Sequence, residues 1–276
     1  MKLLIIPSLS KHSFVIVATL AGAMWLLAGC EQKKPEAGSH EGHASSAAAP
    51  PQQAPAPINP AVTGTVSGVV TFAGAAPKAA TIDMSQDPAC VMGPNAGKES
   101  VSEAVVVKGG KLANVFVYVK EGLPAGNYGV PSEPVVIDQQ GCRYVPHVAG
   151  AVAGQKVKFL NSDPTMHNVH PDAQANSPWN ITQTPKGDPI EKSFTKPELM
   201  MKVSCNQHPW MRMYLNVVPH PFFAVSGLDG KFEIKGLPPG EYTVAAVHER
   251  LGEKTARIKV AEKQTATAEF GFGATQ

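Results

Sequence analysis

Short apolar segments, each bounded by glycine or proline, are the feature that most limits how this 276-residue chain can fold. The segments are rich in Val, Phe, Ile and Tyr, which favour strands, and no long helical period connects them. Turn pairs such as Asp229-Gly230 separate them. The clearest segments are 65–72, 115–119, 155–160, 214–218, 231–234 and 241–247. The pattern predicts an all-β protein built as β-sandwiches.

The charge pattern gives no sign of a nucleic-acid partner. The formal net charge is +2, and the sequence has no basic cluster and no RNA- or DNA-binding motif. It also lacks a Ser-His-Asp order, a glycine-rich phosphate loop and a paired-carboxylate cluster, so we do not expect an enzyme. Multicopper oxidation would need further His-x-His pairs, which the sequence lacks.

The N-terminus carries the pattern of a secretory signal. Lys2 and Lys11 precede an apolar run at 14–28 that is too short and wrongly flanked for a stable membrane span. The run ends in Leu-Ala-Gly-Cys30, which resembles a bacterial lipobox. That resemblance implies that residues 1–29 form a lipoprotein signal peptide. It also implies that a lipid on Cys30 anchors the mature chain to a membrane.

The next stretch, 30–62, is rich in Pro, Ala, Gln, Ser and Gly. Such a composition cannot bury enough apolar surface to fold, so we expect a disordered tether. By the same resemblance to lipoproteins, Glu31 after the cysteine favours the outer membrane. The expected location is the bacterial cell envelope, on the periplasmic or the cell-surface side.

The four cysteines divide unequally. If Cys30 carries lipid, three remain in an oxidising compartment, and one of them has no disulfide partner. The simplest partition pairs Cys90 with Cys142 in a structural disulfide. Cys205 then needs protection of another kind, which a bound metal would supply.

A set of metal-binding side chains surrounds Cys205. His208 lies three residues later, and the thioethers of Met211 and Met213 follow closely. His167 comes just after the strand predicted at 155–160, so it can face Cys205 from a strand end. A thiolate, two imidazoles and a weakly bound thioether are the ligands of a mononuclear electron-transfer copper site.

Two separated pieces of the chain resemble a cupredoxin. The first is YVPHVAGAVAGQKVKFLNSDPTMHNVHP, and the second is VSCNQHPWMRMYLNV, in which the Cys, His and Met spacing is similar to the amicyanin ligand loop. The resemblance covers about 135–218. It implies a Greek-key β-sandwich with one copper bound by His167, Cys205, His208 and Met211.

The same resemblance assigns roles to residues beside the ligands. Asn168 corresponds to the asparagine whose side chain braces the ligand loop, a type of contact that fixes ligand orientation. Pro209 and Trp210 correspond to the apolar patch around the exposed imidazole edge of His208. The three residues together form the expected electron port.

Two alternatives to this ligand set remain open. Met213 lies eight residues after Cys205, the plastocyanin spacing, and can replace Met211 as the axial ligand. His170 can join His167, Cys205 and His208 in a tetrahedral zinc site, which would be structural and without redox activity.

A second module follows the ligand loop. The run DGKFEIKGLPPGEYTV resembles the last hairpin of carboxypeptidase regulatory-like domains, which are small transthyretin-like β-sandwiches. We expect its first strand at 65–72 and its second at 111–119. The economical arrangement is one discontinuous sandwich, 63–128 and 219–273, with the cupredoxin domain inserted at 129–218. The alternative is two small sandwiches that flank the cupredoxin.

The sequence therefore predicts a lipid-anchored, extracytoplasmic type 1 copper protein that carries single electrons to or from a redox partner protein. The alternative is a copper-handling or zinc-stabilised envelope lipoprotein without a redox role.

Overall fold

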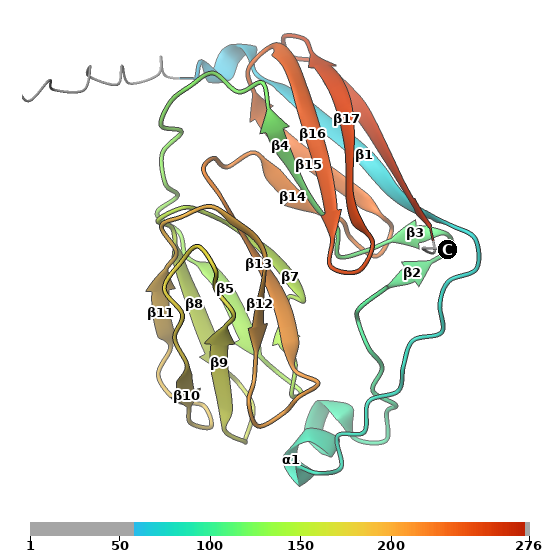
Figure 1. The fold of residues 1–276 in the computed structure, drawn as a ribbon, viewed down its shortest axis with the longest axis vertical. Coiled ribbons are helices and arrows are strands. Elements are labelled where there is room, and N and C mark those ends of the chain that lie inside the picture. Colours follow the sequence, from blue (N-terminus) through green and yellow to red (C-terminus); the bar gives the residue numbers. More distant parts are fainter. Residues whose placement is uncertain (1–57, 274–276) are drawn as a thin grey trace, which may run out of the picture. The chain divides into compact units, whose positions relative to one another are not determined.

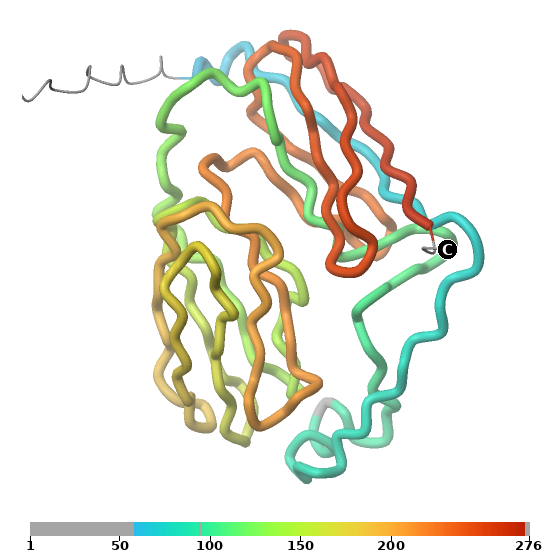
Figure 2. Tube along the Cα trace, in the orientation of Figure 1, coloured from blue at the N-terminus to red at the C-terminus, as the bar shows by residue number. Residues whose placement is uncertain are grey.

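The computed structural model describes residues 58–273, and nearly all of their regular structure is β-strand (Figures 1 and 2), which confirms the predicted fold class. Within this range, helical structure is confined to short turns: η1 (Pro60–Val62), α1 (Pro88–Val91) and η2 (Gly93–Asn95). No helix of the described range is long and apolar enough to cross a membrane. The predicted signal peptide, the lipidated Cys30 and the tether as far as residue 57 lie outside the described residues.

The middle of the chain forms one sandwich, called here the first sandwich. Its strands are β5 (Val135–Gln139), β6 (Tyr144–Val145), β7 (Val148–Val152), β8 (Lys156–Asn161), β9 (His167–Pro171), β10 (Ile181–Gln183), β11 (Ile190–Ser193), β12 (Glu198–Ser204) and β13 (Arg212–Val218). One sheet has the order β11-β8-β5-β6, and the other has the order β10-β9-β12-β13-β7. Strands β5 and β8 pair in parallel, as do β7 and β13.

Alternation along the strands builds the core of this sandwich. In β13, Met213, Leu215 and Val217 are buried, as successive residues on one face of a strand should be. Strand β12 pairs antiparallel with β9 as well as with β13, and Ser204 lies opposite His170. This register brings the end of β12 and the start of β9 to the same end of the sheet.

Strands from both ends of the described chain form the second sandwich. They are β1 (Gly64–Ala73), β2 (Val107–Lys108), β3 (Lys111–Leu112), β4 (Phe116–Glu121), β14 (Phe223–Val225), β15 (Lys231–Leu237), β16 (Gly240–His248), β17 (Gly252–Val260) and β18 (Thr265–Gly273). In one sheet, β1 pairs with β15, β18 and β3, and in the other, β4 pairs with β14 and β16. Each sheet thus contains strands from before β5 and after β13. The predicted domain limits themselves stay a prediction.

The prediction of a single strand at 111–119 is wrong. The segment is divided into β3, which pairs with β1, and β4, which belongs to the other sheet. Asn114 between them has a φ of 60°, in the left-handed region that interrupts a strand. The strands β2 and β3 form a hairpin through Gly109 and Gly110, both with positive φ, as a tight hairpin turn requires.

The connection between β1 and β2 packs on the first sandwich, although the sequence assigned it to the second. We call residues 81–101 the cap; its ends meet in a β-bridge between Thr81 and Val101. Met84 and Cys90 of the cap belong to the core of the first sandwich. A disulfide joins Cys90 to Cys142, as predicted.

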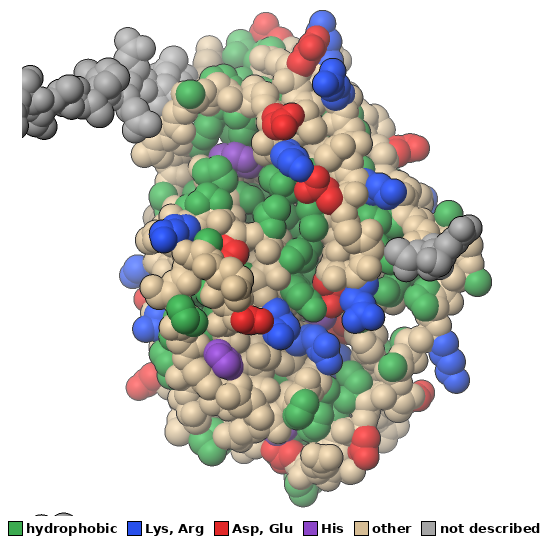
Figure 3. Space-filling view, viewed as in Figure 1, with side chains coloured by type: hydrophobic (Ala, Val, Ile, Leu, Met, Phe, Trp, Pro, Cys, Tyr) green, Lys and Arg blue, Asp and Glu red, His purple; other side chains and the backbone are tan. Residues whose placement is uncertain are grey.

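The surface carries charges of both signs. Acidic and basic side chains are interspersed on the face of the described residues drawn in Figure 3. This mixture matches the small net charge of the sequence.

Candidate metal centre

Three donor side chains meet at one end of the first sandwich. His167 opens β9, Cys205 directly follows β12, and His208 lies in the turn that leads into β13. Their ligand atoms lie within 4.8 Å of one another. The exposed fractions are 0% for His167, 3% for Cys205 and 3% for His208, so the cluster is closed to solvent.

The 205–211 turn is fixed by its own backbone. The N–H of Cys205 donates to the carbonyl of Met211 at 3.2 Å, and the N–H of Met211 donates to the carbonyl of His208 at 2.8 Å. These bonds close a short loop between two antiparallel strands. The loop holds Cys205 and His208 in a defined relation to each other.

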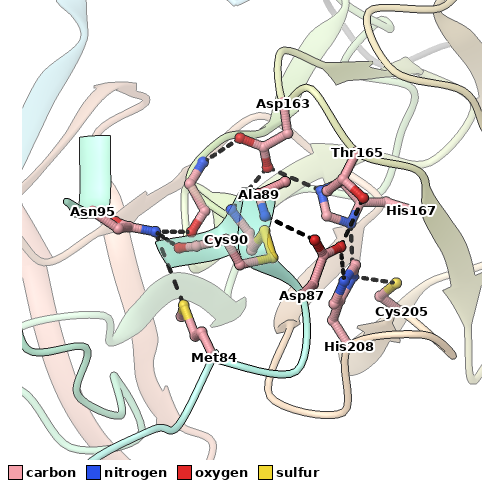
Figure 4. The surroundings of a disulfide bond; sticks show 12 residues. Met84, Asp87, Ala89, Cys90, Asn95, Asp163, Thr165, His167, Cys205 and His208 are labelled. Carbon is pink, nitrogen blue, oxygen red and sulfur yellow. Dashed lines mark hydrogen bonds and ion pairs between the residues drawn. A yellow bond between two sulfur atoms is a disulfide. The ribbon is translucent and has the colours of Figure 1, made fainter. Parts of the chain in front are cut away.

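The donor atoms point toward a common point (Figure 4). The Nδ1 atoms of His167 and His208 lie 2.9 Å apart, and Sγ of Cys205 lies 3.6 Å from Nδ1 of His208. A thiol sulfur and two imidazole nitrogens this close together, in a dry site, fit a single copper or zinc ion. These three residues are the ones that would hold it.

The surroundings favour the thiolate form of Cys205. Burial by itself would raise its pKa, but hydrogen bonds from His167 and His208 outweigh burial and lower the pKa to about 5. The backbone N–H of Asn168 also donates to Sγ, at 3.2 Å. The thiolate is the form of cysteine that binds metals.

A buried carboxylate holds the other nitrogen of His167. Oδ2 of Asp163 lies 2.9 Å from Nε2 of His167, and Asp163 also accepts hydrogen bonds from the backbone N–H groups of Gly141 and Cys142. Burial opposes protonation of His167, yet the bonds to Asp163 and Cys205 raise its pKa. A carboxylate in this position orients the ring so that Nδ1 faces Nδ1 of His208.

A second carboxylate comes from the cap. Oδ2 of Asp87 lies 3.0 Å from Nε2 of His208 and accepts a hydrogen bond from Oγ1 of Thr165 at 2.8 Å. Its Oδ1 accepts from the N–H of Ala89, so Asp87 also caps α1. The cap therefore places a charged group on the remote edge of the His208 ring.

The prediction of an exposed His208 edge is wrong, because the cap covers it. Pro209 is exposed, and Trp210 is half-buried with its Nε1 donating to the carbonyl of Cys142 at 3.2 Å. The rings of His208 and Trp210 lie 5.1 Å apart between centroids. Of the three residues predicted as the electron port, Pro209 is exposed, Trp210 is half-buried and His208 is buried.

Asn168 supports the site in a different way from the one expected. Its backbone N–H contacts Cys205, whereas its side-chain Nδ2 donates to Thr182 and Asn180, which lie in and beside β10. The side chain therefore does not brace the ligand loop. The resemblance to cupredoxins predicted a contact from Asn168, but the group that makes it is the backbone N–H and not the side chain.

His170 is turned away from the cluster. Its Nδ1 lies 2.9 Å from the side-chain oxygen of Asn206, and it belongs to none of the candidate ligand groups among the described residues. The structure therefore does not bring His170 together with His167, Cys205 and His208. A zinc site that includes His170 is not formed.

Both candidate axial residues are buried. Met211 and Met213 lie in the core of the first sandwich, with exposed fractions of 1% and 0%. Only Met211 is tied to the ligand turn by backbone bonds, whereas Met213 lies opposite Val203 within the β12–β13 pairing.

Sequence reasoning missed the two carboxylates. Asp163 lies four residues before His167, just after the strand predicted at 155–160. Asp87 precedes Pro88, the signature of a helix N-cap, and lies close to a cysteine predicted to bond to Cys142. Because Asp87 lies three residues before Cys90, the predicted Cys90–Cys142 disulfide was the feature from which the position of the cap near the first sandwich could have been predicted.

Comparison with solved structures returned cupredoxins as structural neighbours. The copper-containing nitrite reductase NirK from Thermus scotoductus SA-01 is 23% identical with a TM-score of 0.29, over 35% of this chain and 25% of that chain. The purple cupredoxin from Nitrosopumilus maritimus is 21% identical with a TM-score of 0.26, over 30% of this chain and 98% of that chain. A methionine-to-alanine mutant of amicyanin in its Cu(I) form is 19% identical with a TM-score of 0.28, over 37% of this chain and 97% of that chain.

The chain thus spans about a quarter of the nitrite reductase and nearly the whole of the two smaller proteins. No protein-family model matches the sequence, and no curated protein matches it either.

Proposed function

We propose that this chain is a type 1 copper protein that carries single electrons. One copper ion would be held by Cys205, His167 and His208. The observation that carries this proposal is the convergence of one buried thiolate and two Nδ1 atoms at the end of a β-sandwich.

The donor set suits a centre that changes oxidation state by one electron. Bound copper supplies that one-electron chemistry, with thiolate favouring Cu(I) and imidazole suiting Cu(II). The chain contributes a fixed arrangement: Cys205 and His167 lie at strand ends, and Asp163 and Asp87 hold the histidine rings by their remote nitrogens. Burial of the three donors keeps water out of the site.

Met211 is the favoured axial ligand. Its backbone bonds to Cys205 and His208 tie it to the ligand turn, so its position follows theirs. Met213 remains the alternative, since its thioether is buried in the same core.

The proposed route for electrons passes through Trp210. Its ring lies beside His208 and reaches the surface next to the exposed Pro209. A redox partner protein would dock there, because the cap closes the other edge of the His208 ring.

We also propose that the protein acts in the bacterial cell envelope, anchored by lipid on Cys30, and that it is not an enzyme. The lipobox pattern and the polar tether support the anchor. A copper-handling role without electron transfer is the competing proposal. Burial of all three donors favours retention of copper over exchange.

A redox titration of the copper-loaded protein tests the electron-transfer proposal. We expect one copper per chain, reduced by ascorbate and reoxidised by ferricyanide with one electron per copper over repeated cycles. The His170→Ala variant is the matched control and should behave like the wild type. Copper that is lost on each reduction would favour the handling role, and a chain that retains only zinc would contradict both.

A further inference from the structure

The Cys90–Cys142 disulfide adjoins the same histidine that serves the candidate metal centre. The two sulfurs and a ring nitrogen of His208 all lie within 4.8 Å of one another. Sγ of Cys142 also lies within 4.8 Å of ligand atoms of Asp163 and His167. Figure 4 shows the disulfide facing this group. The donors of the centre and the disulfide therefore form one continuous buried cluster.

The bond between the two sulfurs decides whether they can bind metal. Disulfide sulfur is a poor ligand, whereas thiolate is a strong soft ligand that selects Cu(I). A dithiol reductant breaks the bond by exchange: its own disulfide forms, two electrons pass to the protein, and Cys90 and Cys142 become thiols. Metal binding then releases the thiol protons.

We propose that reduction of this disulfide creates a second soft-metal site, in which Cys90, Cys142 and His208 bind one Cu(I). The site needs none of the proposed electron-transfer activity. It rests on the proposed function only in sharing His208 with the first centre.

His208 has a ring nitrogen for each site. Its Nδ1 faces Cys205 and His167, and its Nε2 faces the cap, where it contacts Asp87. A ring that binds ions at both nitrogens carries no ring proton, so Cu(I) at Nε2 takes the place of the proton shared with Asp87, and that proton is released together with those of the two thiols.

Other contacts hold both cysteines in place when the sulfur–sulfur bond is broken. Nδ2 of Asn95 donates to the carbonyls of Cys90 and Gly141, at 2.8 Å each, and so joins the cap to the loop of Cys142. On the other side, Asp163 accepts from the N–H of Cys142 at 2.8 Å. The reduced pair therefore stays near His208 without a covalent link.

A Cu(I) titration against a chromogenic chelator, carried out without oxygen, tests the second site. Wild-type chain, a Cys205→Ser variant and a Cys90→Ser/Cys142→Ser variant are each titrated before and after treatment with a phosphine reductant. Reduction should add one Cu(I) per chain to the wild type and to Cys205→Ser. The double variant should gain none. Alkylation and mass spectrometry count the new thiols, and near-ultraviolet circular dichroism shows that the chain stays folded.

The Cys205→Ser variant separates the two proposals, because it removes the thiolate of the first centre and leaves the second set intact. Two new thiols without added Cu(I) would overturn the second site. Reduction of the disulfide by the phosphine only in the unfolded chain would overturn it too. So would an equal gain of bound Cu(I) in the Cys90→Ser/Cys142→Ser variant. Failure of the oxidised wild type to bind copper would count against the electron-transfer proposal alone.

Discussion

Two buried histidines of the first sandwich and two of the second have pKa values shifted in opposite directions. In the first, His167 and His208 contact carboxylates and the thiol of Cys205, and these contacts raise their pKa values against the effect of burial. In the second, burial dominates: it lowers the pKa of His220 and lowers that of His248 to about 4.

The partners explain the difference. His220 donates from Nε2 to the carbonyl of Val119 and packs against Phe222, so its neutral ring is satisfied. His248 lies beside Phe272 and accepts from the N–H of Arg250. Glu249 opposes the fall in the pKa of His248, but burial outweighs it and no hydrogen bond joins the two side chains. A buried imidazole without a hydrogen-bonded carboxylate behaves as an aromatic core residue, whereas one that lies between a thiolate and a carboxylate is arranged as a ligand.

Replacement of one buried histidine in each sandwich should give the largest difference between a ligand histidine and a core histidine. We expect His167→Ala to lose copper binding, because one of three donors is gone. His220→Ala should keep one copper per chain and lose only stability. Copper titration with a competing chelator measures both. Equal copper loss in the two variants would break the distinction between ligand and core histidines.

The two buried methionines offer a comparison inside the first sandwich. Met213→Ala should cost about 2–5 kcal/mol of stability through the cavity it leaves, with the copper spectrum unchanged. Met211→Ala should keep copper but change the colour and the reduction potential. Denaturant unfolding and visible spectroscopy distinguish them, and the reverse assignment of effects would make Met213 the axial ligand.

Asp163 tests how far the carboxylate supports its histidine. Asp163→Asn keeps the shape of the side chain but removes the negative charge that faces Nε2 of His167. We expect copper affinity to fall by about 10–100-fold. Asp172→Asn is the control: it removes a carboxylate that pairs with Lys202 at the surface, and it should leave the affinity unchanged. An unaltered affinity in Asp163→Asn would show that the bond to His167 is only structural.

His248 predicts an acid sensitivity of the second sandwich. Its pKa is lower in the folded chain than in the unfolded chain, so the unfolded state binds more protons below the ordinary pKa of histidine. Stability is therefore complete above about pH 6.5 and falls as the pH drops toward 4, with a loss of about 2 kcal/mol at pH 5.

Urea unfolding of the copper-free chain at pH 7 and pH 5 measures this loss. His248→Asn, which retains an acceptor for the N–H of Arg250, should show a loss smaller by that amount. An identical pH dependence in the variant would assign the acid sensitivity to other groups.

Local alternation made most of the strands predictable. The segment 241–247 becomes β16 and 65–72 becomes β1, each with only small changes at the ends. The break after β3 was not predictable, because it depends on the left-handed backbone of Asn114 and on which sheet accepts each half. Ile58 packs against the core of the second sandwich and Pro60–Val62 forms η1, so the last residues of the predicted tether belong to the folded part of the chain.

The ligand turn was predictable because Cys205 and His208 are close in sequence and carry a specific spacing. The cap was not, because Asp87 reaches His208 across 121 residues, and no periodic pattern encodes such a contact. The buried state of His208 follows from this long-range contact. A likeness to a family in which the edge is open could not supply it.

The most direct test of the copper centre is the visible absorption spectrum of the protein with one equivalent of Cu(II). We expect an intense sulfur-to-copper charge-transfer band that bleaches on reduction and is absent in Cys205→Ser. A colourless copper complex, or the same band in Cys205→Ser, would contradict a centre built on the Cys205 thiolate.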